Sequence, residues 1–241
     1  MVTRLDTGDA AAHTRAMLHI TPPRDETELL DRARRLAGRT LGDIAAGLDS
    51  VVPADLRRHK GWVGQLLEQA LGASAGSLAA PDFEAIGVEL KTLPVDSRGL
   101  PRESTYVCTV PLESAGEDWE HSWLRRKLAR VLWLPVQADR NIPLVDRRIG
   151  SALLWSPSPE EEALLRRDWE ELTERILLGE LEQISARHGE ALQIRPKAAD
   201  SRALRHAVGA DGGRVLTNPR GYYLRAAFTA AILRRHFVLP G

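Results

Sequence analysis

The first third of the chain carries apolar residues at helical spacing. From about Thr27 they recur every three or four positions and form one stripe, which Gly38 would end: Leu29, Leu30, Ala33, Leu36 and Ala37. Thr40 then stands where a helix N-cap is expected, ahead of a second short apolar run. Residues 61–71 repeat the helical pattern and are followed by Gly72. The spacing therefore predicts three helices before residue 73.

Beyond residue 87 strand-like patterns alternate with helical ones. Residues 88–95 and 104–112 alternate between apolar and polar side chains, as half-buried strands do. Ser158 followed by proline and glutamates predicts a helix start, and Leu165, Trp169, Leu172 and Ile176 give that helix a buried face. The other predicted elements are strands at 131–136 and 191–196, helices at 124–132, 198–207 and 226–237, and a hairpin-like segment at 221–226. This mixture predicts an α/β protein.

Composition excludes several classes of protein. A single cysteine, Cys108, rules out a disulfide framework and a zinc site built from several thiolates. No stretch approaches the roughly 18 consecutive apolar residues of a membrane helix. The first 20 residues carry charges throughout and lack the apolar core of a signal peptide. We therefore expect a cytoplasmic protein with no membrane association.

The charges are unevenly distributed along a chain whose formal net charge is zero. Residues 187–241 contain ten basic and three acidic residues, a local excess that suits a polyanion but also fits a merely solvated surface. Only four of the 33 basic residues are lysines: Lys60, Lys91, Lys127 and Lys197. A lysine that persists among arginines indicates a position that needs a compact ammonium, or one able to lose its proton.

The segment from Asp82 to Lys91 carries the most informative chemistry. Side chains on a strand alternate, so Glu89 and Lys91 would share one side while Val88 and Leu90 face the core. Asp82 lies one turn upstream and can fold back beside Glu89, and the preceding helix offers a third carboxylate, Glu68. Carboxylates bind Mg²⁺, and a neighbouring lysine can orient water or stabilise charge during phosphodiester hydrolysis. The competing interpretation is a solvated strand face with a local ion pair.

The segment PDFEAIGVELKTLPVDS resembles the PD-(D/E)xK nuclease core as it occurs in the MutH family of mismatch-repair endonucleases. Five further segments resemble that family in the same order: KGWVGQLLEQALGASAGS, RRKLARVLWLPV, GSALLWSPSPEEEALLRRDWEEL, ARHGEALQIRPKAA and PRGYYLRAAFTAAILRRHF. The resemblance covers residues 22–238 and leaves residues 1–21 as a leader. It implies a restriction-endonuclease-like fold, a mixed sheet flanked by helices, with two lobes around a DNA-binding cleft. The N-terminal lobe would be catalytic, and the basic lobe toward 187–238 would read DNA.

The same resemblance implies roles for individual residues. Asp82 and Glu89 would bind Mg²⁺, with Mn²⁺ or Ca²⁺ able to take its place; Lys91 would be the catalytic lysine and Glu68 would complete the acidic cluster. Lys60 and Lys127 match lysines around the active site and the DNA backbone, and Lys197 matches a DNA-contacting lysine. All four lysines of the chain thus fall on functional positions of the family.

Sequence recognition is also implied by the resemblance. The family nicks the unmethylated strand of hemimethylated GATC sites, just 5′ of the G. Arg195 and Tyr223 would read bases, Tyr223 close to the adenine methyl group, and Tyr106 would probe the minor groove. Because Tyr222 and Tyr223 are adjacent, one of them should belong to the core. The chain departs from the family in having Tyr106 where phenylalanine is expected and Asp200 where asparagine is expected.

Three functions are compatible with these observations. The first is a monomeric nickase of methyl-directed mismatch repair, acting on double-stranded DNA and activated by a MutL-type ATPase. The second is a type II restriction endonuclease that cuts GATC, although one active site in one chain favours nicking. The third is a DNA-binding protein without catalysis. It would not need Glu68, Asp82, Glu89 and Lys91 close together.

Overall fold

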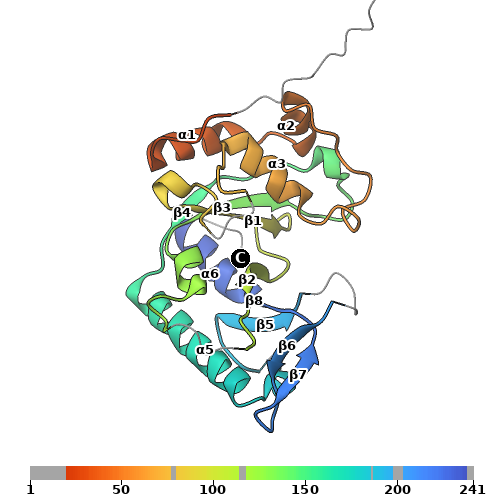
Figure 1. Ribbon diagram of the computed structural model, residues 1–241. Helices are drawn as coiled ribbons and strands as arrows, with labels where there is room; N and C mark the ends of the chain where they lie inside the picture. The colour runs from red at the N-terminus through yellow and green to blue at the C-terminus, as the bar shows by residue number, and fades with distance from the viewer. Residues whose placement is uncertain (1–19, 77–79, 114–117, 186, 198–202, 238–241) are drawn as a thin grey trace, which may run out of the picture.

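The computed structural model describes residues 20–76, 80–113, 118–185, 187–197 and 203–237 (Figure 1). Its elements are six α-helices, eight strands and three short 3₁₀ helices within those ranges. The predicted α/β class is confirmed. No helix among these residues is long and apolar enough to cross a membrane.

Three helices form the N-terminal part of the described chain, as the apolar spacing predicts. They are α1 (Glu26–Leu36), α2 (Leu41–Gly47) and α3 (Trp62–Leu71). Asp25 caps α1, Thr40 and Asp43 form a capping box on α2, and Gly72 ends α3 in a left-handed conformation. Figure 1 shows these helices together on one side of the sheet that contains β1.

The first sheet has the strand order β1–β3–β4, with β1 at Glu89–Val95, β3 at Val131–Gln137 and β4 at Leu153–Trp155. Strands β1 and β3 are parallel whereas β3 and β4 are antiparallel, so this sheet is mixed, as expected. Strand β3 is apolar and buried from Val131 to Val136, as expected of a strand covered on both faces. Leu132 and Leu134 pack toward α1–α3, and Val131 and Trp133 pack into a second core on the opposite face.

The second core joins the remaining helices to a second sheet of order β2–β8–β5. The strands are β2 (Thr105–Thr109), β8 (Arg220–Leu224) and β5 (Leu192–Pro196), and the helices are α4 (Trp123–Leu128), α5 (Pro159–Leu177) and α6 (Ala226–His236). Strands β6 (Arg205–Val208) and β7 (Arg214–Thr217) form a separate hairpin. The 3₁₀ helices are η1 (Glu84–Ile86), η2 (Leu144–Asp146) and η3 (Leu181–Gln183).

The buried stripe predicted on α5 is confirmed. Leu165, Trp169, Leu172 and Ile176 are all buried, and Ser158 caps the helix through a capping box with Glu161. Asp168, on the same helix, is also buried, and its Oδ2 accepts hydrogen bonds from the backbone N–H groups of Glu190, Ala191 and Leu192. This carboxylate fixes the start of β5 against α5.

Several predicted elements are wrong. Residues 205–208 form strand β6 rather than the end of a helix, because they pair with β7. The segment 221–226 is no hairpin: β8 is the central strand between β2 and β5. Helix α4 ends at Leu128, so Val131 and Leu132 belong to β3. Residues 1–19 of the predicted leader, residues 198–202 of the predicted helix, and with them Asp200, lie outside the described residues.

Candidate active site

A tight turn brings Asp82 back beside the first residues of β1. The backbone N–H of Phe83 donates to the carbonyl of Val88 at 2.9 Å, and Gly87 closes the turn with a φ of 65° that favours glycine. Phe83 and Val88 are buried and anchor the turn in the core. The backbone N–H of Leu90 donates to Asp82 Oδ2 at 2.8 Å. The predicted return of Asp82 to the strand is therefore confirmed.

Glu89 lies in the interior and is held by two lysines. Its side chain is only 3% exposed. Lys91 Nζ lies 2.5 Å from Oε1 and Lys127 Nζ lies 2.8 Å from Oε2, so each carboxylate oxygen has its own ammonium. Lys127 Nζ also donates to the backbone carbonyl of Ala80 at 3.2 Å. The interpretation of this strand as a solvated face is therefore wrong.

The carboxylates of Glu68 and Asp82 interact electrostatically with Glu89 and with both lysines. Burial raises the pKa of Glu68 above its ordinary value, and repulsion from Asp82 raises it further. Burial likewise raises the pKa of Asp82, and the Glu89 carboxylate adds to the rise. Lys91 and Lys127 oppose the shift in both groups. At both carboxyls, burial and repulsion between the acids thus outweigh the two lysines.

The carboxylates fit a hard divalent cation by their chemistry. Across the described ranges, no group of three or more His, Cys, Asp or Glu side chains is arranged as a ready metal site. Mg²⁺, however, takes one or two protein carboxylates and keeps several waters. Asp82 and Glu89 provide such a pair: burial raises the pKa of Asp82, and the Glu89 carboxylate raises it further through a repulsion that a bound cation would relieve.

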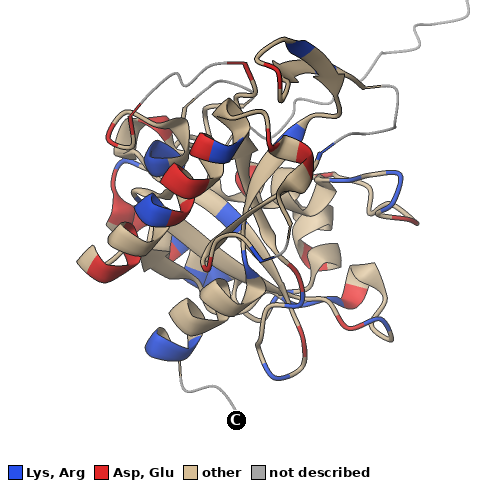
Figure 2. Ribbon diagram, turned by 90° about the horizontal axis from the view of Figure 1, so that it is seen from below, with Lys and Arg blue, Asp and Glu red and all other residues tan. Residues whose placement is uncertain are grey.

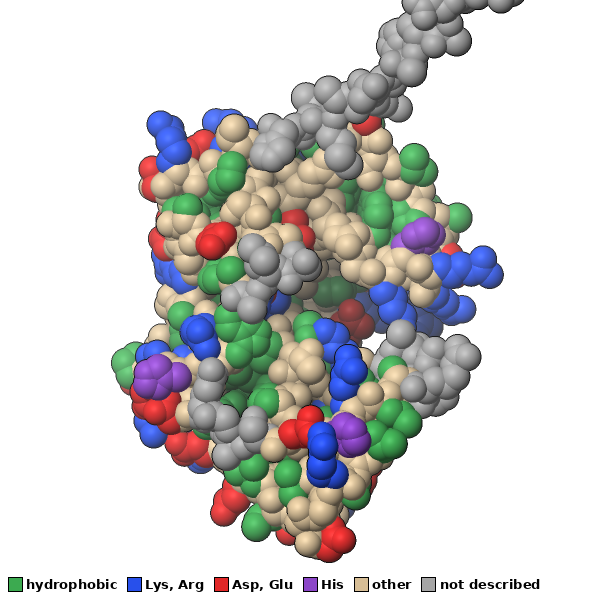
Figure 3. Space-filling model, in the orientation of Figure 1, with side chains coloured by type: hydrophobic (Ala, Val, Ile, Leu, Met, Phe, Trp, Pro, Cys, Tyr) green, Lys and Arg blue, Asp and Glu red, His purple; other side chains and the backbone are tan. Residues whose placement is uncertain are grey.

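A groove of about 640 Å³ passes in front of this cluster. In Figure 3 the molecule is hollowed between its upper and lower halves, with basic side chains along the hollow. Six of the residues predicted from the sequence line the groove: Lys60, Glu68, Lys91, Tyr106, Arg195 and Tyr223. The lining therefore combines residues from α3, β1 and the second sheet.

The remaining predicted residues lie around the groove rather than in its lining. Asp82 and Glu89 do not line the groove, but each contacts a residue that does. The backbone N–H of Leu90 donates to Asp82, and Lys91 Nζ donates to Glu89. Lys127 is likewise absent from the lining and contacts Glu89. Lys197 places its Nζ 3.3 Å from the centre of the Tyr106 ring, a cation–π contact at the edge of the groove.

The two groove tyrosines form a pair across neighbouring strands. Tyr106 on β2 and Tyr223 on β8 are register partners, and their rings meet edge to face with centroids 5.4 Å apart. Gly221 makes room for them, because a Cβ there would approach a Tyr106 ring carbon to 2.9 Å. Tyr222 is 2% exposed, so the expectation that one of the adjacent tyrosines belongs to the core is confirmed.

Arg195 lies next to this aromatic pair. Its guanidinium carbon is 5.8 Å from the centre of the Tyr223 ring. Ser104, which the sequence analysis missed, accepts a hydrogen bond from Arg195 Nη1 at 3.3 Å and another from Gln193 Nε2 at 2.7 Å. Only the position of Ser104 at the start of a predicted strand could have indicated this contact.

Basic and acidic residues are interspersed over the rest of the molecule (Figure 2). The basic excess of residues 187–241 is partly offset by ion pairs with acids elsewhere: Arg220 with Glu182, Arg214 with Glu113 and Arg235 with Glu161. Arg195 and Lys197 instead contact aromatic rings beside the groove. The charge count therefore overstates the basic character of this part of the surface.

A carboxylate–lysine cluster beside a groove lined by cations and aromatic rings would suit metal-assisted chemistry on a nucleic acid. Residues 71–168 match the family model described as DNA mismatch repair enzyme MutH. The DNA mismatch repair protein MutH of Salmonella paratyphi C is 59% identical over 221 residues, covering 91% of this chain and 96% of the relative. That of Serratia proteamaculans is 57% identical over 217 residues, covering 90% and 95%.

The chain belongs to the MutH family of DNA mismatch repair enzymes. The resemblance seen in the sequence motifs is thereby confirmed. The roles assigned to individual residues stay predictions, although the structure brings Glu68, Asp82, Glu89, Lys91 and Lys127 into one cluster.

Proposed function

We propose that this protein is a Mg²⁺-dependent endonuclease that nicks the unmethylated strand of hemimethylated GATC sites during mismatch repair. The observation that carries the proposal is the cluster of Asp82, Glu89 and Lys91 beside a groove that Lys91 lines together with Tyr106, Arg195 and Tyr223. The proposed catalytic lysine and the proposed base-reading side chains thus share one groove. Double-stranded DNA would lie in that space, between a catalytic lobe and a DNA-reading lobe.

Asp82 and Glu89 would hold the cation, and Glu68 would add negative charge beside them. The bound cation would supply Lewis-acid activation of the scissile phosphate and of the attacking water. Lys91 projects from β1 into the groove and would orient that water, take its proton or stabilise the charge that develops on the phosphate. Lys127 would keep the Glu89 carboxylate in place through its 2.8 Å contact.

The cations at the groove would position the DNA backbone. Lys60 is exposed at the start of α3, and Lys197 stands beside the Tyr106 ring. Such contacts fix the register of the duplex without reading its sequence. Arg195 and Tyr223 would supply the sequence-dependent contacts, with Tyr223 sensing the adenine methyl group and Tyr106 probing the minor groove.

The protein would act as a monomer in the cytoplasm and would be activated by a MutL-type ATPase. A single carboxylate–lysine cluster in the described part of the chain favours nicking over double-strand cleavage. The groove residues come from two sheets, so a partner that moves one sheet toward the other would complete the site.

Supercoiled plasmid carrying hemimethylated GATC sites tests the proposal. With Mg²⁺ and a MutL-type activator, the wild-type protein should give open-circular plasmid. Lys91→Ala should abolish nicking and keep DNA binding in a gel-shift assay. The matched control is Arg167→Ala, because Arg167 is 67% exposed and its ion pair with Glu190 is solvated. It should nick as the wild type does.

The outcomes separate the three functions. Linear product at unmethylated sites would indicate a restriction endonuclease instead of a nickase. Plasmid that stays supercoiled with Mg²⁺ or Mn²⁺ and the activator, but is bound, would indicate a non-catalytic DNA-binding protein.

Tyr223→Ala tests the reading role separately. It should nick hemimethylated and fully methylated plasmid at more similar rates than the wild type does. Unchanged discrimination would remove Tyr223 from methyl sensing. Tyr222→Phe is the control, since Tyr222 is buried and its hydroxyl contacts only Thr173 among the described residues.

A further inference from the structure

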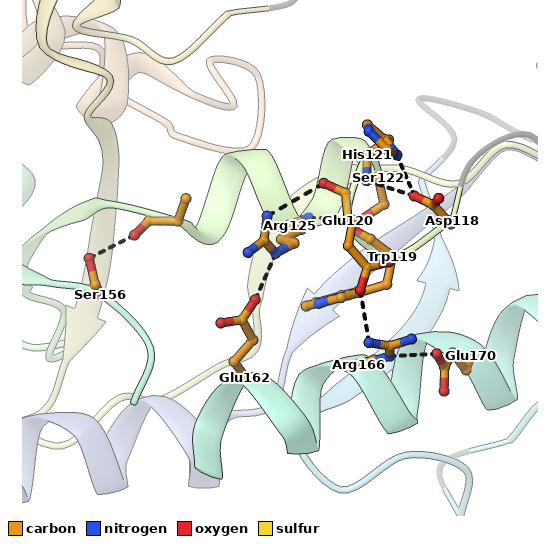
Figure 4. Close-up of polar contacts among 11 residues, drawn as sticks. Asp118, Trp119, Glu120, His121, Ser122, Arg125, Ser156, Glu162, Arg166 and Glu170 are labelled. Atoms are coloured by element: carbon orange, nitrogen blue, oxygen red, sulfur yellow. Dashed lines mark hydrogen bonds and ion pairs between the residues drawn. The ribbon is translucent and has the colours of Figure 1, made fainter. Parts of the chain in front are cut away.

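Helix α4 delivers Lys127 to the catalytic cluster from a fixed platform. Ser122 caps the helix by accepting from the backbone N–H of Arg125 at 3.2 Å. Arg125 Nε then donates to Glu162 Oε1 on α5 at 2.6 Å, as Figure 4 shows. At the other end, Ser156 Oγ donates to the carbonyl of Ala129 at 2.7 Å. The backbone of α4 therefore has polar anchors at both ends.

The side chain of Lys127 still has four rotatable bonds between that platform and Glu89. Its side chain is 13% exposed, and its ammonium has two oxygen acceptors, Glu89 Oε2 at 2.8 Å and the Ala80 carbonyl at 3.2 Å. Those acceptors belong to other segments, so they do not by themselves fix the path of the methylene chain. A neighbour on α4 itself is needed for that.

Trp123 is that neighbour. It lies one helical turn before Lys127, and residues four apart share a helix face. Lys127 Nζ is 5.0 Å from the centre of the Trp123 ring, within the range of a cation–π contact, and the ring packs on the second core. Arg126 contacts the same ring at 5.5 Å, but its side chain is exposed.

We propose that Trp123 is a positioning residue for the endonuclease reaction, whose indole ring holds the Lys127 ammonium against the Glu89 carboxylate. The inference rests on the proposed function for its effect on rate, but the contact itself is independent of it. Without the ring, Lys127 leaves Glu89 for part of the time. The orientation of a predicted cation ligand is then lost, while the groove that binds DNA is unchanged.

The activity test compares Trp123→Phe, which keeps a ring, with Trp123→Leu, which keeps only apolar bulk. Trp123→Leu should lower kcat for plasmid nicking about tenfold without changing KM, as expected for a partly desolvated cation–π contact. Trp123→Phe should retain most of the rate. Arg126→Ala, which removes the other cation from the ring, should behave as the wild type.

A double mutant separates positioning from general damage. Trp123→Leu in a Lys127→Ala background should cost nothing further, because the ring acts only through that lysine. Additive losses would overturn the proposal, and so would a Trp123→Leu variant as active as the wild type. If circular dichroism shows that Trp123→Leu does not fold, Trp123→Met takes its place in every arm.

Lysine-selective ¹³C labelling gives a readout that does not depend on activity. The chain has four lysines, so the NMR spectrum contains four εCH₂ signals, and Lys127→Ala assigns one of them. The Trp123 ring current should displace the Lys127 signal, and Trp123→Leu should return it toward the position of a solvated lysine while leaving Lys60 unchanged. A Lys127 signal that does not move would refute the contact. Wild-type protein that shows the displaced signal but never nicks would refute the proposed function alone.

Discussion

Asp168 offers a sharp test of how the second sheet is held in place. Its carboxylate is buried on α5, and Oδ2 accepts three backbone N–H groups: those of Glu190 at 2.8 Å, Ala191 at 2.6 Å and Leu192 at 2.9 Å. Ala191 and Leu192 are fully buried. Asp168→Ala would therefore leave two buried N–H groups without an acceptor, whereas the N–H of Glu190 is near the surface and can bind water.

The expected loss follows from these contacts. An unsatisfied buried donor costs about 1–3 kcal/mol, so two of them should lower the free energy of unfolding by about 4 kcal/mol. That is a large part of the roughly 5–15 kcal/mol that stabilises a domain. Asp168→Asn keeps an oxygen acceptor but not its charge, and charge-assisted hydrogen bonds are about twice as strong as neutral ones, so it should lose about 2 kcal/mol.

Urea unfolding followed by circular dichroism measures both losses. Glu171→Ala is the matched control on the same helix, because Glu171 is 43% exposed and its ion pair with Arg175 is long at 3.5 Å. It should change stability by less than about 0.5 kcal/mol. A loss below about 1 kcal/mol for Asp168→Ala, or equal losses for alanine and asparagine, would refute the reasoning.

Three other predictions concern the titratable groups. In the metal-free protein, Asp82→Asn and Glu68→Gln should each raise the melting temperature near neutral pH. Because burial raises both pKa values, the folded protein binds protons that the unfolded chain has released, and wild-type stability falls as pH rises above about 4. The prediction would be contradicted if neither variant had a higher melting temperature than the wild type at about pH 8. It would also be contradicted if the melting temperatures of the variants depended on pH as that of the wild type does. Ca²⁺ should raise the melting temperature of the wild type but not of Asp82→Asn, and an equal rise in both would exclude Asp82 as a ligand. Burial raises the pKa of the Cys108 thiol to about 12, so a disulfide reagent at about pH 8 should react only after urea unfolds the protein; rapid labelling of the folded protein would count against that burial.

The local parts of the fold were predictable from the sequence. The caps at Thr40 and Ser158 and the helix end at Gly72 depend on residues a few positions apart, and all three lie as predicted. The alternation also predicted that Val88 and Leu90 face the core, although it did not predict that Glu89 is buried as well. Such features need only local geometry.

The parts that depend on distant pairing were not predictable in this way. Residues 205–208 form a strand only because β7 lies beside them, and no local pattern shows that β8 is the centre of a sheet. The contact of Lys127 with Glu89 joins residues 38 positions apart. The rarity of lysine marked Lys127 as important, yet only the structure places it against the Glu89 carboxylate.

Glu89 and Lys91 belong to one sheet, and Tyr106 and Tyr223 belong to the other. Tyr106, Tyr223 and Arg195 stand on three adjacent strands of the sheet β2–β8–β5, whereas Glu89 and Lys91 stand on β1 of the sheet β1–β3–β4. Substitutions among the residues on one sheet therefore need not disturb the backbone of the other sheet. Under the proposed function, a fold divided in this way would let evolution, or a protein engineer, change which DNA sequence is chosen while retaining the chemistry that breaks the strand.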